Sequence, residues 1–181
     1  MSRTPVREVL IKLENDGLVQ LIPRKGVRVS AISPSDMQEI YEILTLLEPE
    51  VAASLASSAL SEKELKPLEQ ATEAMEEAIA ARDLMKWAEA DDQFHRHTLA
   101  LHTNERLKNV VNGLLDQAHR ARVFTLNLRD IPEQSTQEHR AIIKAIKGGD
   151  AEMARDVFRN HRLRAASELN AILEKFKLVR F

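Results

Sequence analysis

The chain contains no cysteine, few aromatic residues and no long apolar run. Without cysteine it forms neither a disulfide nor a thiolate metal site, which fits a cytoplasmic protein. No stretch approaches the ~20 apolar residues of a membrane helix, and the N-terminus lacks a signal-peptide pattern, so we expect no membrane partner. Aromatic residues make up 4% of the 181 residues and charged residues 30%, a composition typical of a helical soluble protein.

Motifs of the common enzyme classes are also missing from the sequence. It has no Ser-His-Asp set, no glycine-rich loop that would cradle a phosphate and no redox motif. The net charge of −2 is small, but it is unevenly distributed. Residues 1–32 carry a net charge of +3, which leaves −5 for the remainder. A basic end on an acidic body favours an anionic partner, nucleic acid first, and the alternative is charge gathered on a solvated face.

The basic end has the pattern of one helix followed by a hairpin. Ser2 or Thr4 can cap a helix whose apolar residues recur at helical spacing, and Asp16-Gly17 ends it. Residues 18–22 and 27–31 read as two strands around the basic turn at 23–26. This is the second half of a winged helix-turn-helix, so we expect a partial DNA-binding domain at residues 1–32.

Residues 33–181 read as six helices with no strand. Helix starts are marked by capping residues at 33, 61, 83, 104 and 150, and a proline at 132 begins the fifth helix. The expected fold is mostly α, an antiparallel six-helix bundle that follows the partial winged helix. We expect residues 33–181 to form one effector-binding, metal-binding and dimerisation domain.

One carboxylate and three imidazoles point to the core of this bundle. Asp91 and His95 stand four residues apart, so they share a helix face that is otherwise apolar. His139 and His161 lie on apolar stripes of their own helices. A carboxylate on such a face is costly unless something pairs it, and this donor set suits a divalent transition metal, with zinc or nickel favoured. The alternative is that each histidine is an ordinary core histidine.

The spacing of the last two histidines adds a geometric argument. His139 and His161 flank a probable helix–helix turn at Gly148-Gly149-Asp150, and position 150 is their midpoint. Residues equidistant from the turn of an antiparallel helix pair lie at about the same level. The two imidazoles are therefore expected to face each other, with the helix of Asp91 and His95 supplying the other ligands.

Several motifs at the N-terminus resemble the GntR family of bacterial transcription regulators. The matching residues are Ser2-Arg3-Thr4-Pro5-Val6-Arg7-Glu8, Leu13, Gly17-Leu18-Val19, Pro23, Gly26 and Val29. The resemblance implies that the helix from Thr4 reads the major groove of double-stranded operator DNA, with Arg3 and Arg7 contacting the DNA and Ser2 touching phosphate. It also implies that Lys25-Gly26 approaches the minor groove.

The chain departs from that family at its start. The family has two helices before this motif, whereas this sequence begins at the reading helix. A misassigned start, a shortened chain and a true fragment are the three explanations.

The body resembles the FadR-like branch of the same family, in its six-helix form. The matching residues are Asp36 to Glu42, Leu47-Glu48, Asp91, Phe94-His95, Asn104, Glu138-His139, Ala145-Ile146, Gly149-Asp150, Ala154 and His161. The resemblance implies a divalent metal bound by Asp91, His95, His139 and His161 at the base of an effector cavity. Many relatives carry Arg at the position of Leu44, so any contact made by that Arg is absent here.

The sequence therefore predicts a homodimeric, metal-containing transcription regulator that senses a small organic acid. The acid would chelate the metal through open coordination positions. His119 is a candidate for the cavity wall, and Arg120 and Arg122 are candidates for holding the anion, the alternative being a salt-bridged helix surface. Two other functions remain open: a metal-dependent hydrolase, because such a metal activates water, and a sensor fragment that does not bind DNA.

Overall fold

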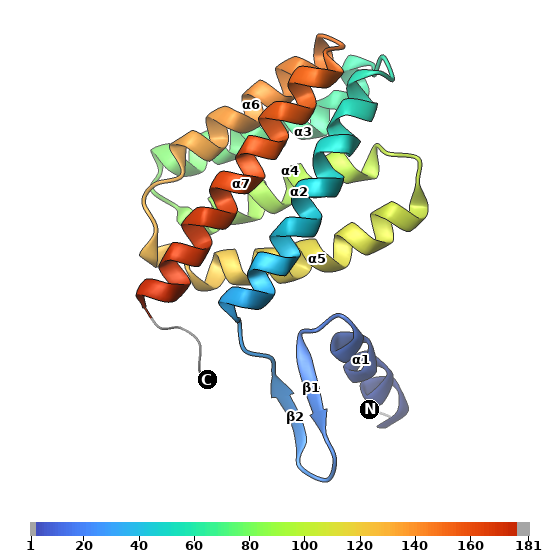
Figure 1. Ribbon diagram of the computed structural model, residues 1–181, viewed down its shortest axis with the longest axis vertical. Helices are drawn as coiled ribbons and strands as arrows, with labels where there is room; N and C mark the ends of the chain where they lie inside the picture. Colours follow the sequence, from blue (N-terminus) through green and yellow to red (C-terminus); the bar gives the residue numbers. More distant parts are fainter. Residues whose placement is uncertain (1–2, 177–181) are drawn as a thin grey trace.

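The computed structural model describes residues 3–176. The N-terminal segment, which we call the reading segment because the sequence predicts DNA binding there, comes first. It consists of helix α1 (Arg3–Asn15) and an antiparallel hairpin of β1 (Val19–Ile22) and β2 (Gly26–Val29). Gly17, at φ +73°, allows the chain to leave α1, and the amide of Leu18 donates to the carbonyl of Leu13 at 2.9 Å. In the hairpin, Val19 pairs with Val29, and the tip bends at Arg24 and Gly26, both with positive φ. This segment forms one end of the molecule (Figure 1).

Six α-helices and one short 3₁₀ helix follow. They are α2 (Pro34–Ala56), α3 (Glu62–Ala80), α4 (Leu84–Ala100), α5 (Glu105–Phe124), η1 (Leu126–Leu128), α6 (Glu133–Lys147) and α7 (Ala151–Lys175). Side chains of Ser33, Ser61, Asp83, Asn104 and Asp150 accept hydrogen bonds from the first turns of their helices. The expected mostly-α fold, a partial winged helix followed by a helical bundle, is confirmed.

The helices bury one continuous core. α2 packs along α7, and α3 packs along α4, while α6 lies against both α3 and α7 (Figure 1). Trp87, Phe94 and Phe158 are among the largest side chains of that core. Because α4 contacts α2, α3 and α5, side chains on its inward face meet groups from several helices.

Some boundaries differ from the expectation by a few residues. The first strand begins at Val19 rather than at 18. The second strand ends at Val29, before the expected 31. Within residues 3–176 no helix is long and apolar enough to cross a membrane.

The turn between α6 and α7 sets how these two antiparallel helices are aligned along their axes. Gly149 adopts φ +69°, and the amide of Asp150 donates a hydrogen bond to the carbonyl of Ala145 at 3.0 Å. The carboxylate of Asp150 then accepts from the amide of Met153 at 2.9 Å and starts α7. Left-handed backbone is accessible to glycine at little cost, so this residue sets where the two helices meet.

We predict opposite effects on stability for two Gly→Ala changes. Gly149→Ala lowers the free energy of unfolding by about 1–2 kcal/mol, because a Cβ is strained at this positive φ. Gly113→Ala, inside α5 with open space around it, raises that free energy by about 0.5–1 kcal/mol. Urea unfolding of both variants measures the difference, and equal effects would contradict the role given to Gly149.

Candidate metal centre

Four polar residues from three helices meet in the interior of the bundle. Asp91 and His95 project from α4, His139 from α6 and His161 from α7, and each is at most 2% exposed. One ligand nitrogen from each histidine lies within 4.8 Å of the others. The ring centroids of His139 and His161 are 4.6 Å apart, so the two imidazoles do face each other across the α6–α7 pair.

The Asp91 carboxylate completes this cluster. Its Oδ2 is 3.9 Å from Nε2 of His95, and its Oδ1 is 3.8 Å from Nε2 of His139. These separations are too long for hydrogen bonds, but they place the carboxylate beside two of the three rings. The structure thus brings together all four residues that the sequence singled out.

Two glutamates fix the orientation of two of the rings. Nδ1 of His95 lies 3.1 Å from Glu48 Oε1, and Nδ1 of His161 lies 2.8 Å from Glu138 Oε2. A carboxylate accepts, so Nδ1 carries the proton and donates it in both rings. The lone pair is then on Nε2, the nitrogen available to a metal.

Arginines of α7 hold both glutamates in place. Arg162 Nε donates to Glu48 Oε2 at 2.5 Å, and Arg164 Nε donates to Glu138 Oε1 at 2.7 Å. Arg162 is fully buried, so its charge needs the partner it has in Glu48. Burial alone would raise the pKa of Glu138, but hydrogen bonds from Arg164 and His161 lower it to about 2.

Burial keeps the histidines neutral. Desolvation lowers the pKa of His95 and His139 well below the usual value, and nearby positive groups add to this effect. Desolvation also lowers the pKa of His161, although its hydrogen bond to Glu138 acts in the opposite direction. Neutral imidazole is the form that binds a metal, so the rings are ready as ligands at neutral pH.

Asp91 is held as a carboxylate by Arg122. Arg122 Nη1 lies 2.9 Å from Asp91 Oδ2, an ionic contact without hydrogen-bond geometry. Desolvation would raise the pKa of Asp91, but the charge of Arg122 and the neighbouring groups lower it overall. A buried carboxylate that stays ionised is a suitable hard ligand.

Unsatisfied buried atoms show that the cluster fits a metal. Nε2 of His95, both nitrogens of His139 and Oδ2 of Asp91 have no hydrogen-bond partner in the part of the chain that the structure describes. Such atoms are costly in a core unless something binds them. An ion held at about 2.0–2.1 Å by each nitrogen requires the nitrogens to be within about 4.2 Å, so the rings need only a small approach.

A narrow cavity of about 20 Å³ lies beside this cluster. Asp91 and His161 form one side of it, and three arginines contribute to the wall, namely Arg122, Arg129 and Arg164. Of the residues expected to line an effector pocket, Arg122 does so. Arg120 instead donates to the backbone carbonyl of Ser30, and His119 is half-buried with Nδ1 3.9 Å from Asp92 Oδ1.

Some residues of the site were missed at the level of sequence. Glu48 and Glu138 stood in matched motifs, but nothing in the spacing showed that they reach Nδ1 of a histidine. Arg129 lies in the segment between η1 and α6, where helical periodicity gives no signal. A polar residue on an apolar helix face, as Glu48 is, was the one available clue.

The residues expected to contact DNA are only partly described. Ser2 lies outside the described residues, and of Arg3 and Thr4 only the backbone is described, at the start of α1. Arg7 is exposed on α1, and Lys25 and Gly26 are exposed at the tip of the hairpin. The described residues of this set are therefore open to solvent at one end of the molecule.

Two family models match the chain. The model of the FCD domain matches residues 39–164, more than two thirds of the chain. The model described as bacterial regulatory proteins, gntR family, matches residues 1–29. This chain belongs to the FCD branch of the GntR family.

Curated relatives of this GntR protein are transcription regulators. An uncharacterised HTH-type regulator in the TAR-I ttuE-ttuC' intergenic region of Agrobacterium vitis is 43% identical over 102 residues, 55% of this chain and 60% of that protein. The regulator YdhC of Bacillus subtilis is 29% identical over 178 residues, 98% of this chain and 79% of YdhC. The repressor RspR of Escherichia coli K12 is 28% identical over 161 residues, 89% and 70% of the two chains.

Solved structures share the fold. McbR/YncC of E. coli matches with a TM-score of 0.82 at 20% identity, over 93% of this chain and 85% of that one. The metal-free FCD domain of TM0439 matches with a TM-score of 0.66 at 18% identity, over 81% and 99%. The family match and the curated relatives make the protein a transcription regulator of the GntR type.

We predict that Glu138→Gln weakens zinc binding by about 10- to 100-fold while the protein stays folded. An amide can present either end to His161, so the proton is no longer fixed on Nδ1. Glu76→Gln is the matched control, because Glu76 also pairs with an arginine, Arg140, but touches no histidine. Competition with a zinc-binding dye measures both affinities, and equal affinities in the two variants would refute the orienting role.

Proposed function

We propose that this GntR regulator holds a divalent metal at Asp91, His95, His139 and His161, and that a small carboxylate binds to that metal as its effector. The observation that carries the metal is the set of three buried imidazoles with ligand nitrogens within 4.8 Å of one another, where Nε2 of His95 and of His139 lacks a partner among residues 3–176. Three nitrogens and one carboxylate oxygen suit zinc or nickel. The ion would supply a positive centre with coordination positions left open.

Charge balance supports an anionic effector. The fully buried charges already cancel in pairs, Asp91 with Arg122 and Glu48 with Arg162. The histidines are neutral, so a divalent ion adds two positive charges that the core does not compensate. A small hydroxy- or keto-acid would offset this charge and chelate the ion.

Arg129 supports the same class of effector. It lines the cavity beside Asp91 and His161, it is half-buried, and its Nε is buried without a hydrogen-bond partner in the described part of the chain. Desolvation lowers its pKa, as expected for a guanidinium that lacks a full counter-charge. A carboxylate that binds both the ion and Arg129 would satisfy both positive groups.

The cavity has to enlarge for an acid to enter. Its volume of about 20 Å³ holds about one water molecule, whereas Arg129 stands on the short segment between η1 and α6. Movement of that segment would open the cavity. Effector binding would then shift the population from the form with the closed cavity to a form with an open cavity.

The DNA end gives this switch its output. We assign DNA reading to residues 1–32 and sensing and dimerisation to residues 33–181, with Arg3, Thr4 and Arg7 on the reading helix, Ser2 at phosphate, and Lys25 and Gly26 at the wing. A homodimer pairs two reading helices with a palindromic operator. The distance between the two reading helices of the dimer would then depend on what is bound at the metal site.

We predict that hydroxy- or keto-acids bind to the zinc-loaded protein and at least about tenfold more weakly to metal-stripped protein. Arg129→Ala weakens binding to the loaded form by about tenfold or more, because it removes a hydrogen bond from a charged group. Arg140→Ala is the control and leaves acid binding unchanged, because Arg140 pairs with Glu76 at the surface and does not line the cavity. Calorimetric titration measures all three, with circular dichroism to show that the stripped form is folded.

Two outcomes would contradict this function. A metal content near zero in protein loaded with zinc would remove the metal centre. An acid that binds loaded and stripped protein with equal affinity would separate the effector from the metal.

We also predict different effects of two basic residues on DNA recognition. Arg7→Ala relaxes the preference at one base position, since a bidentate Arg–guanine contact is worth about 1–3 kcal/mol of discrimination. Lys25→Ala lowers affinity for all sequences alike, because a wing-tip lysine meets backbone charge. Selection from a random duplex library, carried out with the full-length protein, separates the two effects. An unchanged preference in Arg7→Ala would show that α1 does not read bases.

A further inference from the structure

Helix α5 touches both the candidate metal centre and the segment that leads to the DNA-reading end. Arg122 and Arg120 stand two residues apart, about 200° around the helix, so they point to opposite sides of it. We propose that α5 couples the two sites, with Arg120 as a latch on the backbone of Ser30 that opens or closes with the charge at Asp91. This proposal rests on the metal centre proposed above.

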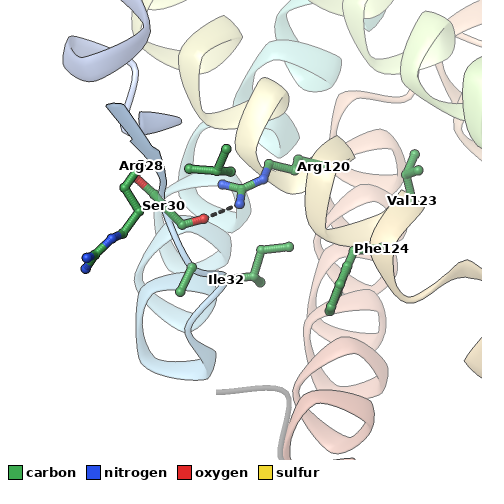
Figure 2. A pocket seen from close by; sticks show the side chains of 8 residues that line it. Arg28, Ser30, Ile32, Arg120, Val123 and Phe124 are labelled. Carbon is green, nitrogen blue, oxygen red and sulfur yellow. Dashed lines mark hydrogen bonds between the residues drawn. The ribbon is translucent and has the colours of Figure 1, made fainter. Parts of the chain in front are cut away.

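The outward side of α5 holds the reading segment at two points. Arg120 Nη2 donates to the carbonyl of Ser30, as Figure 2 shows, and the amide of Ser30 donates to the carbonyl of Leu18 at 3.0 Å. One turn earlier, a Cβ at Gly17 would lie only 3.2 Å from Gln117 Oε1, so α5 and the bend after α1 are in close contact. Both contacts fall on one face of α5.

The junction around this latch is hollow. The linker, residues 30–33, joins β2 to α2. A cavity of about 630 Å³ lies between this linker and α5, with apolar walls from Val29, Ile32, Val123 and Phe124 (Figure 2). A junction without close packing leaves orientation to its few polar contacts. The hydrogen bond of Arg120 therefore has a large share in fixing where the hairpin sits.

The inward side of α5 responds to charge. Arg122 Nη1 is 2.9 Å from Asp91 Oδ2, and Arg122 is 5% exposed, so little water screens it. An ion bound by Asp91 and the histidines competes with Arg122 for the carboxylate and repels the guanidinium. Because α5 is one continuous helix, displacement at Arg122 is carried to Arg120, two residues away.

Limited proteolysis tests the latch on the intact chain. The hairpin exposes three trypsin sites, Arg24, Lys25 and Arg28, and mass spectrometry follows their cleavage separately from other sites. We expect zinc alone to speed this cleavage by about tenfold in the unmodified protein, the factor for losing one hydrogen bond from a charged donor. Arg120→Ala is cleaved at the fast rate with and without zinc. Alanine is a good helix former, so this variant keeps α5.

Arg106→Ala is the control, because Arg106 lies in the first turn of the same helix, exposed and remote from the linker. It should behave as the unmodified protein does. Zinc uptake is measured in the same samples. Uptake without a change in hairpin cleavage overturns the coupling and leaves the metal centre standing. Absence of uptake overturns the metal centre, and the coupling with it.

Discussion

Neutralisation of buried charge is the constraint on which the interior of this protein depends. Glu48 and Arg162 join α2 to α7, and Asp91 and Arg122 join α4 to α5, all four side chains being almost fully buried. Removing one member of such a pair leaves an isolated charge in the core, at a cost of about 3–5 kcal/mol. We attribute these polar pairs to the proposed metal site that they surround. They place Asp91 and orient His95, while the turn at Gly149 sets His139 opposite His161.

In the proposed function, the same arrangement would allow sensing without an open pocket. The cavity beside Asp91 is too small for an organic acid, and its wall contains an arginine without a hydrogen-bond partner for its Nε within residues 3–176. Both facts support the proposed site, which an ion and an anion would complete. Because Arg122 belongs to α5, a change in charge there acts on a helix that also contacts the linker at Ser30. Helix α5 thus lies between the proposed metal centre and the N-terminal segment, although these two are far apart in the sequence.

Periodicity and capping were sufficient to predict the helices, and turn symmetry was sufficient to predict that His139 and His161 meet. Both kinds of signal are local, and both depend on few residues, such as Asp150 at the start of α7 and Gly149 before it. The glutamates that orient the rings could not be predicted this way. Glu48 is 47 residues from His95 and 114 from Arg162, so only the packing of α2 against α4 and α7 brings them together.

The contact that Arg120 makes could not be predicted either. Helical periodicity shows which face of α5 is apolar but not which segment lies against the other faces, and two residues along α5 are enough to turn a side chain from the cavity to the backbone of Ser30. Arg129 lies outside any helix and so had no pattern to reveal it. Sequence predicted which residues are polar in apolar surroundings, whereas contacts between distant helices decided what each one does.

Anomalous diffraction from crystals grown with zinc tests the central claim most directly. The account predicts one strong anomalous peak per chain at about 2.0–2.1 Å from Nε2 of His95, His139 and His161, with Asp91 as a further ligand. A peak at any other position, or Nδ1 rather than Nε2 as the ligand of His95 or His161, would contradict it. If the crystals take up no zinc at this cluster, the three histidines are ordinary core histidines and not metal ligands.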